Sequence, residues 1–267
     1  MPGSPQPPGP DSGHAVLAAQ AIVKRFGGFA AVDGVSIAVN KGEIVGLIGP
    51  NGAGKTTFFD CVAGGQRADS GRITINGRDA AGAPAHRRIG LGLARTFQIP
   101  RPFATMSLVE NVMLGRKDQI GERMWPNWFR HGAVGAQERE TYERAMALLD
   151  FMALTRLARD PARTLSGGQR KLLELARVLM AEPSIILLDE PAAGVNPSLL
   201  ETIIERILAI HRQGVTFLII EHNMDMVQRL CGRVLVMAGG KTLAQGTPAE
   251  VARDPDVIAA YLGGRPA

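Results

Sequence analysis

Residues 49–56 combine the residue types that can hold a chain of phosphates. They read Gly-Pro-Asn-Gly-Ala-Gly-Lys-Thr, a full match to G-x-x-x-x-G-K-[ST]. In such a loop the glycines let successive backbone N–H groups curve around a phosphate, Lys55 neutralises the β- and γ-oxygens, and the Thr56 hydroxyl can reach Mg²⁺. The apolar run at 44–48 predicts a buried strand before the loop, and a helix from about Gly54 would add its positive end. The sequence therefore predicts a binding site for a nucleoside triphosphate.

Two further segments could bind or react with a phosphate, but each also has a purely structural interpretation. Asp189 and Glu190 follow the apolar run 185–188, and on their own they would be interpreted as a solvated helix cap. The segment Leu-Ser-Gly-Gly-Gln at 165–169 opens a predicted helix that ends near residue 180. Ser166 and the amides of the two glycines could bind an anion, although alone they would be a flexible, capped helix start.

The composition is that of a globular protein. With 267 residues, 45% of them apolar, the chain has room for one large or two modest domains. Its longest apolar runs fall far short of the ~18 residues that span a bilayer. A net charge of +5 permits attraction to anionic lipid or nucleic acid, but the charges are spread along the chain, and we expect no nucleic-acid partner. Cys61 and Cys231 lack C-x-x-C spacing, which favours packed thiols over a disulfide or zinc site.

The first residues predict a disordered tail over 1–14. They are rich in Pro, Gly and Ser and lack the basic and apolar parts of a signal peptide. We therefore expect a protein that stays in the cytosol.

The order of predicted elements indicates an α/β fold. Antiparallel strands are predicted at 15–26, 35–40 and 72–78, the last with the Asn-Gly pair of a tight hairpin. Strands and helices then alternate, at 44–48, 55–63, 185–188, 198–211 and 215–220. This alternation predicts a parallel sheet covered by helices.

The rest of the chain is predicted to be mostly helical. Residues 109–181 lack strand signals and include an amphipathic stretch at 138–154, which indicates a helical insertion. The C-terminal part predicts a hairpin at 234–245, then short helices at 248–252 and 256–261.

Together, the phosphate-binding loop, the Leu-Ser-Gly-Gly-Gln segment and the strand ending in Asp189-Glu190 resemble the ATP-binding-cassette (ABC) ATPases. The resemblance covers about residues 15–264 and implies one ABC ATPase domain. Its fold would be a RecA-like P-loop NTPase core with an antiparallel β subdomain and a helical subdomain at about 99–181.

The resemblance also implies roles for particular residues, with ATP and Mg²⁺ as cofactors. Asp189 would hold Mg²⁺ through water, Glu190 would polarise the attacking water, and Ser166 with its glycines would close over the γ-phosphate of a partner subunit. The implied nucleotide-binding residues are Phe26, Gly49, Pro50, Asn51, Gly52, Ala53, Gly54, Lys55, Thr56, Thr57, Ser166, Gly167, Gly168 and Gln169. Those near the metal are Thr56, Gln98 and Asp189.

Weaker positions complete the implied site. Phe26 would stack on adenine, Gln98 would sense Mg²⁺ and water, and His222 would contact the γ-phosphate. Judged alone, Phe26 is nearly as well explained as core filler, Gln98 would be an unremarkable surface residue, and a histidine after a strand, such as His222, is usually structural. Asn196 departs from the acidic residue commoner at its position, which puts communication between the two sites in doubt.

Several segments resemble the ATPase of branched-chain amino-acid importers in particular, including 90–98, 190–197, 220–225 and 254–263. The implied partners are a second ABC ATPase subunit, identical or different, two membrane permeases and, indirectly, an extracytoplasmic solute-binding protein. The chain would then lie on the inner face of the cell membrane. Similar subunits serve urea or other amides, and soluble ABC ATPases that act on DNA or ribosomes are a further alternative, although they usually carry two cassettes or extra modules.

The segment 124–129 holds both tryptophans of the chain, Trp125 and Trp128, and basic residues lie around it, at 116, 117, 123 and 130. Aromatic rings beside cations suit an interface, so this segment could dock on the permeases. It could equally pack on the helix predicted at 138–154.

Overall fold

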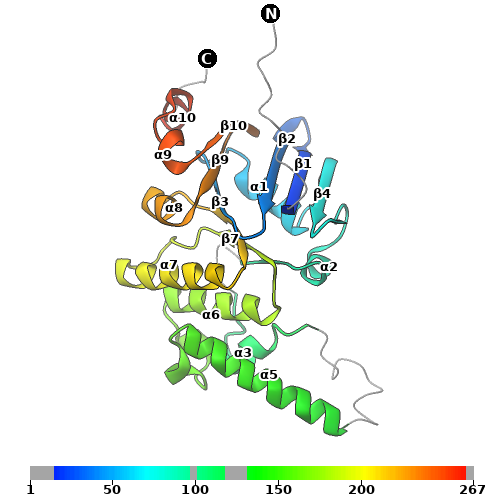
Figure 1. Ribbon diagram of the computed structural model, residues 1–267, viewed down its shortest axis with the longest axis vertical. Coiled ribbons are helices and arrows are strands. Elements are labelled where there is room, and N and C mark those ends of the chain that lie inside the picture. Colours follow the sequence, from blue (N-terminus) through cyan, green and yellow to red (C-terminus); the bar gives the residue numbers. More distant parts are fainter. Residues whose placement is uncertain (1–14, 97–100, 118–130, 263–267) are drawn as a thin grey trace, which may run out of the picture.

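A computed structural model describes residues 15–96, 101–117 and 131–262, with the side chains of 131–134 left out. Among these residues two sheets form the upper half of the molecule in Figure 1, and the helices α3, α5 and α6 form the lower half. The predicted tail at 1–14 and the tryptophan segment lie outside the described residues. No helix in the described ranges is both long and apolar enough to cross a bilayer.

The smaller sheet is antiparallel, as predicted. Its order within the described residues is β2-β1-β4-β5. The strands are β1 (Ala15–Phe26), β2 (Phe29–Asn40), β4 (Ser70–Ile75) and β5 (Arg78–Asp79). Asn76 and Gly77 turn between β4 and β5 with φ values of 50° and 73°, the left-handed pair that a two-residue hairpin requires. Strand β2 begins six residues before the predicted start, because Gly27 and Gly28 leave only a tight turn after β1.

The larger sheet carries the parallel strands. Its order is β10-β9-β3-β8-β7-β6 in the described part of the chain, and only the β9–β10 pair is antiparallel. The strands are β3 (Ile44–Ile48), β6 (Leu93–Arg95), β7 (Ile185–Asp189), β8 (Thr216–Ile220), β9 (Arg233–Ala238) and β10 (Lys241–Gly246). Strands β3, β7 and β8 are buried along their whole length, which explains why they read as continuous apolar runs.

Helices cover both faces of this sheet. They are α1 (Lys55–Ala63), α2 (Ala85–Gly90), α7 (Pro197–Arg212), α8 (Met224–Leu230), α9 (Pro248–Val251) and α10 (Pro255–Tyr261). One buried apolar cluster includes Phe58, Phe59 and Val62 of α1 with residues of both sheets, and the other joins the opposite face to α7 and to the lower helices. Sequence reasoning missed α2, α8 and β6, which are too short to show a clear period.

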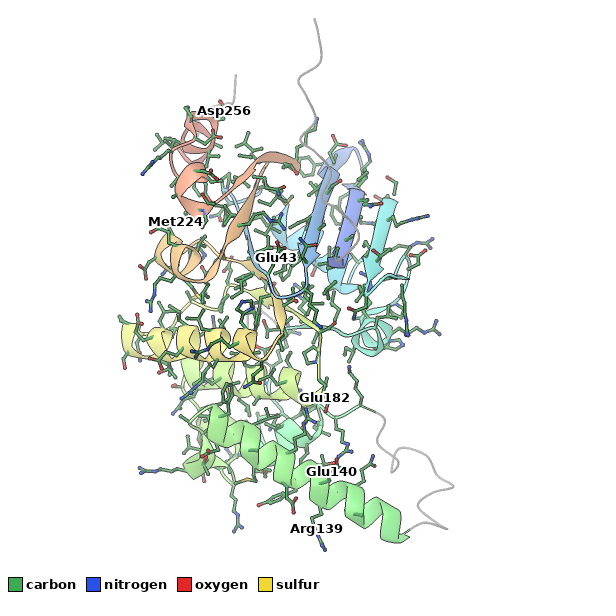
Figure 2. The ribbon with its side chains drawn as sticks, in the orientation of Figure 1. Glu43, Arg139, Glu140, Glu182, Met224 and Asp256 are labelled. Carbon is green, nitrogen blue, oxygen red and sulfur yellow. The ribbon has the colours of Figure 1, made fainter. Side chains whose placement is uncertain are left out.

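The predicted helical stretch is confirmed in the described residues. It comprises α3 (Leu108–Met113), α5 (His131–Phe151), α6 (Gly167–Met180) and two single 3₁₀ turns, Thr155–Leu157 and Ala162–Thr164. Thr141, Ala145 and Leu149 form the buried stripe of α5, whereas Arg139 points away from the molecule (Figure 2). The helix ends three residues before the predicted end, and Ala153 follows with φ 57°.

A close contact between the backbones of two elements joins α3 to α6. A Cβ built on Gly115, just after α3, would lie 2.2 Å from the Arg177 carbonyl oxygen of α6. That atom cannot rotate away, so the position accepts no side chain without movement of a helix.

We therefore expect Gly115→Ala to lower the free energy of unfolding by about 1–3 kcal/mol, the usual cost of overpacking. Gly135→Ala is the matched control, because a Cβ on Gly135 of α5 would meet no atom within 4 Å. It should raise the free energy of unfolding by about 0.5–1 kcal/mol, since alanine loses less backbone entropy than glycine in a helix. Urea unfolding of both variants is the measurement, and a neutral Gly115→Ala would contradict the close packing of α3 on α6.

Both cysteines are free and buried, as predicted. Burial raises the pKa of Cys61 to about 11 and that of Cys231 to about 12. Only a thiolate is an effective nucleophile, and very little forms at pH 8. Native protein should therefore take up no iodoacetamide at pH 8, whereas protein in denaturant should be labelled twice. Mass spectrometry checks this, and rapid labelling of the native protein would contradict the burial.

Candidate functional site

The phosphate-binding loop, residues 49–56, runs from the end of β3 into α1, as its sequence predicts. Two of its glycines are required by close contacts. A Cβ on Gly49 would lie 2.1 Å from the Met237 carbonyl oxygen, and one on Gly54 would lie 2.1 Å from the Ala31 carbonyl oxygen. Gly54 also has φ 93°, in the left-handed region. The loop is therefore held between β2 and β9, and its shape is fixed by the surrounding backbone.

Lys55 faces back into the loop. Its Nζ donates to the carbonyl oxygens of Gly49, at 2.6 Å, and Pro50, at 2.9 Å. Burial lowers the pKa of Lys55, and the nearby Glu190 carboxylate opposes that shift. Thr56 is exposed at the second position of α1, where its hydroxyl can bind a ligand. The remaining predicted nucleotide-binding residues of this region range from exposed (Asn51 and Gly52) through partly buried (Pro50 and Thr57) to buried (Ala53).

Asp189 lies at the carboxyl end of β7 with its side chain almost fully buried. Its Oδ2 accepts a hydrogen bond from Arg95 at 2.8 Å, and Arg95 also forms an ion pair with Asp60 of α1. Burial raises the pKa of Asp189, and the Arg95 guanidinium opposes the shift. Arg95, one of the residues that sequence reasoning did not single out, thus ties α1 to the strand that ends in Asp189.

Glu190 and His222 come together although 32 positions separate them in the chain. The two residues follow the neighbouring parallel strands β7 and β8, and the carboxyl ends of such strands meet at one edge of the sheet. His222 Nδ1 lies 3.9 Å from Glu190 Oε1, and the histidine side chain is 61% exposed. Both side chains can therefore face a phosphate held at the same edge.

Glu221 is a second residue that the sequence analysis missed. Its side chain is 1% exposed, yet its carboxylate accepts three backbone hydrogen bonds. Oε1 accepts from the Ala192 N–H at 2.7 Å, and Oε2 accepts from the N–H groups of His222, at 2.7 Å, and Asn223, at 2.8 Å. Glu221 therefore fixes the loop after β7 against the loop after β8. Its only signal in the sequence is a charge at the end of an apolar strand.

The Leu-Ser-Gly-Gly-Gln segment caps α6. Ser166 Oγ accepts from the Gln169 N–H at 3.3 Å, and Gln169 Oε1 accepts from the Ser166 N–H at 3.0 Å. Ser166 and Gly167 are exposed, so the start of the helix is open to a ligand. Gly168 is buried, and a Cβ there would lie 2.1 Å from a Leu199 methyl group, so it also lets α6 pack closely on α7.

The weaker candidates are placed as follows. Phe26 ends β1 with 49% of its surface exposed, and the Lys24 ammonium lies 5.5 Å from its ring centre. Asn196 is the N-cap of α7, with its Oδ1 accepting from the Leu199 N–H at 2.9 Å, so the departure from an acidic residue keeps the capping function. Gln98 lies outside the described residues.

Comparisons with known proteins agree with this geometry. A family model described as "ABC transporter" matches residues 32–193, and a second, described as "Branched-chain amino acid ATP-binding cassette transporter", matches residues 241–267. A probable branched-chain amino acid transport ATP-binding protein, LivG, of Archaeoglobus fulgidus is 40% identical over 93% of this chain and 95% of its own length. The protein BraF of Pseudomonas aeruginosa, named as a high-affinity branched-chain amino acid transport ATP-binding protein, is 39% identical over 93% and 98%.

A solved structure extends the agreement to the whole fold. The ADP conformation of an ATP-binding cassette of an ABC transporter superposes with a TM-score of 0.81 and 39% identity, covering 93% of this chain and 99% of that one. The P-loop NTPase fold class is therefore confirmed. The chain belongs to the ABC transporter family and is one of its nucleotide-binding ATPase subunits.

Proposed function

We propose that this chain is the ATP-hydrolysing motor subunit of an ABC importer for branched-chain amino acids. The names of the relatives and the match over residues 241–267 support the cargo. The observation that carries the hydrolytic role is the approach of His222 to Glu190 within 3.9 Å at the edge of the sheet where the phosphate-binding loop begins.

The nucleotide would be held by the residues that the sequence predicts. The phosphate-binding loop would surround the β-phosphate with its N–H groups, and Lys55 would exchange its two carbonyl partners for phosphate oxygens. Phe26 offers an exposed ring for the adenine face. Ser166 with Gly167, Gly168 and Gln169 would close over the γ-phosphate of a second subunit, because exposed N–H groups at a helix start attract anions.

The donors near the loop fit Mg²⁺. The Thr56 hydroxyl and the Asp189 carboxylate are hard oxygen ligands, and Mg²⁺ in nucleotide sites is usually held by one or two protein oxygens together with phosphate and water. Gln98 stays a predicted third contributor. When bound, the ion would neutralise charge that develops on the β- and γ-oxygens.

The remaining groups are suited to hydrolysis. Glu190 would accept a hydrogen bond from the attacking water and take its proton as the bond to the γ-phosphorus forms, while the bond from that phosphorus to the β,γ-bridging oxygen breaks and ADP leaves. His222 would donate to a γ-phosphate oxygen, and Glu221 would keep the backbone of His222 in place through its 2.7 Å hydrogen bond. Closure of two such subunits around ATP, and their release after hydrolysis, would supply the movement that a transporter needs.

The proposal includes an assembly. Two ATPase subunits, identical or different, would pair and act on two membrane permeases, with a solute-binding protein outside the membrane. The chain would be a peripheral protein on the inner face of the cell membrane. Within it, residues 15–264 would form one ABC ATPase domain with a helical subdomain at about 99–181.

Glu190→Gln should lower the turnover of ATP by about 10² to 10⁴, the usual contribution of a positioned base, while ATP still binds. Lys55→Ala should instead weaken the binding of ATP, because a charge-assisted contact with phosphate is lost. Steady-state hydrolysis and equilibrium binding of a fluorescent ATP analogue distinguish the two effects. Turnover near the wild-type rate by Glu190→Gln would contradict the assignment.

The cargo can be tested in cells of the source organism. Deletion of the gene should abolish high-affinity uptake of radiolabelled leucine, and a plasmid copy should restore it. A copy with Glu190→Gln should fail to restore uptake, because transport would require hydrolysis. Uptake of labelled urea is the control and should not change. Loss of urea uptake with leucine uptake intact would contradict the cargo but leave the motor role standing.

A further inference from the structure

Glu190 has an unusual backbone conformation for its residue type. Its φ is 48°, in the left-handed region that a residue with a side chain seldom occupies. Pro191 follows it, and a residue before proline normally adopts extended backbone. Such a conformation costs on the order of 1–3 kcal/mol and persists only where the surroundings impose it. The contacts that impose it therefore decide where the Glu190 carboxylate points.

Lys171 of α6 makes two of those contacts. Its Nζ donates to the Glu190 carbonyl oxygen at 2.7 Å and to the Pro191 carbonyl oxygen at 3.1 Å. Burial lowers the pKa of Lys171, and the carboxylates that surround it oppose the shift; these are Glu221, Glu174, Glu190 and Asp189. The Lys171 ammonium thus lies among four acidic groups. It binds the backbone carbonyl of the proposed base, Glu190, and that of the next residue.

Two further hydrogen bonds hold the same loop. The Glu190 N–H donates to the Ile220 carbonyl oxygen at 3.0 Å, and the Ala192 N–H donates to Glu221 at 2.7 Å. Both of those contacts come from the neighbouring strand β8 and its loop, which belong to the same sheet as Glu190. Lys171 differs because it reaches the loop from α6, the helix that begins after Ser166, about 7.5 Å along the helix axis from the serine.

We propose that Lys171 is a positioning residue for ATP hydrolysis, which holds the Glu190 backbone in its left-handed conformation from the side of α6. This inference rests on the proposed role of Glu190. Lys171 would contact neither the nucleotide nor the attacking water, and it would act through the two carbonyl groups. A movement of α6 relative to the sheet would change the direction of the Glu190 carboxylate.

The central test removes the donor and keeps the length of the side chain. Lys171→Met should lower kcat by about 10- to 100-fold, the effect of an ångström-scale misplacement of a catalytic group. The dissociation constant for ATP should change by less than about twofold, since no phosphate contact is lost. Lys171→Arg, which keeps a donor, should recover part of kcat. Lys41→Met is the matched control on an exposed lysine and should behave like the wild type.

A double-variant cycle separates positioning from general stability. In a Glu190→Gln background, Lys171→Met should cause no further loss of the residual single-turnover rate, because the group that it positions is no longer a base. The same fold loss in both backgrounds would overturn the proposal. So would a loss of kcat that appears only together with weaker ATP binding and a lower melting temperature. Should Lys171→Met fail to fold, Lys171→Leu, which also lacks a donor, serves in the same cycle.

The outcomes also distinguish this inference from the proposed function. If Glu190→Gln alone keeps the wild-type turnover, the role of Glu190 is wrong and the inference loses its basis. If Glu190→Gln is inactive but Lys171→Met keeps the wild-type kcat, the proposed function stands and only the positioning role of Lys171 is overturned.

Discussion

The parallel alignment of β3, β8 and β7 is the constraint on which the candidate site depends. Leu47 pairs with Ile220, and Asp189 also pairs with Ile220, so the three strands end at one level. The loops that leave them carry the phosphate-binding glycines, His222 and Glu190. Each strand is fully buried, and their hydrogen bonds leave little freedom to slide. The fold thus brings together groups that are far apart in the chain.

Local constraints then refine this arrangement. Contacts of Gly49 with Met237 and of Gly54 with Ala31 fix the shape of the phosphate-binding loop. On the other side, the buried carboxylate of Glu221 satisfies N–H groups of both loops that follow β7 and β8. A buried charge that accepts several hydrogen bonds is stable, whereas one without partners is costly. The site therefore gains its rigidity from backbone contacts more than from contacts between the proposed catalytic side chains.

The sequence predicted the elements whose signal is local, and it missed what depends on distant partners. The strands that end before Gly49 and Glu190 are continuous apolar runs, and the hairpin at Asn76-Gly77 has its own turn residues, so these could be predicted. Helix α2 is six residues long and shows no period. Three residues of the site matter because of partners far along the chain. Arg95 binds Asp189 at 94 positions, Glu221 binds Ala192 at 29, and Lys171 binds Glu190 at 19. No local sequence pattern contains these pairs.

The two buried cysteines have a practical consequence for measuring whether the helical part moves relative to the sheets. Cys61 belongs to the buried cluster that joins α1 to both sheets, Cys231 belongs to the cluster on the opposite face of the larger sheet, and both residues are buried in the folded chain. New cysteines placed at exposed positions of α5 and of β4 would then be the reactive ones. Fluorescent or spin labels could therefore report the distance between the helical part and the sheets in an otherwise native sequence, with no need to remove the natural thiols.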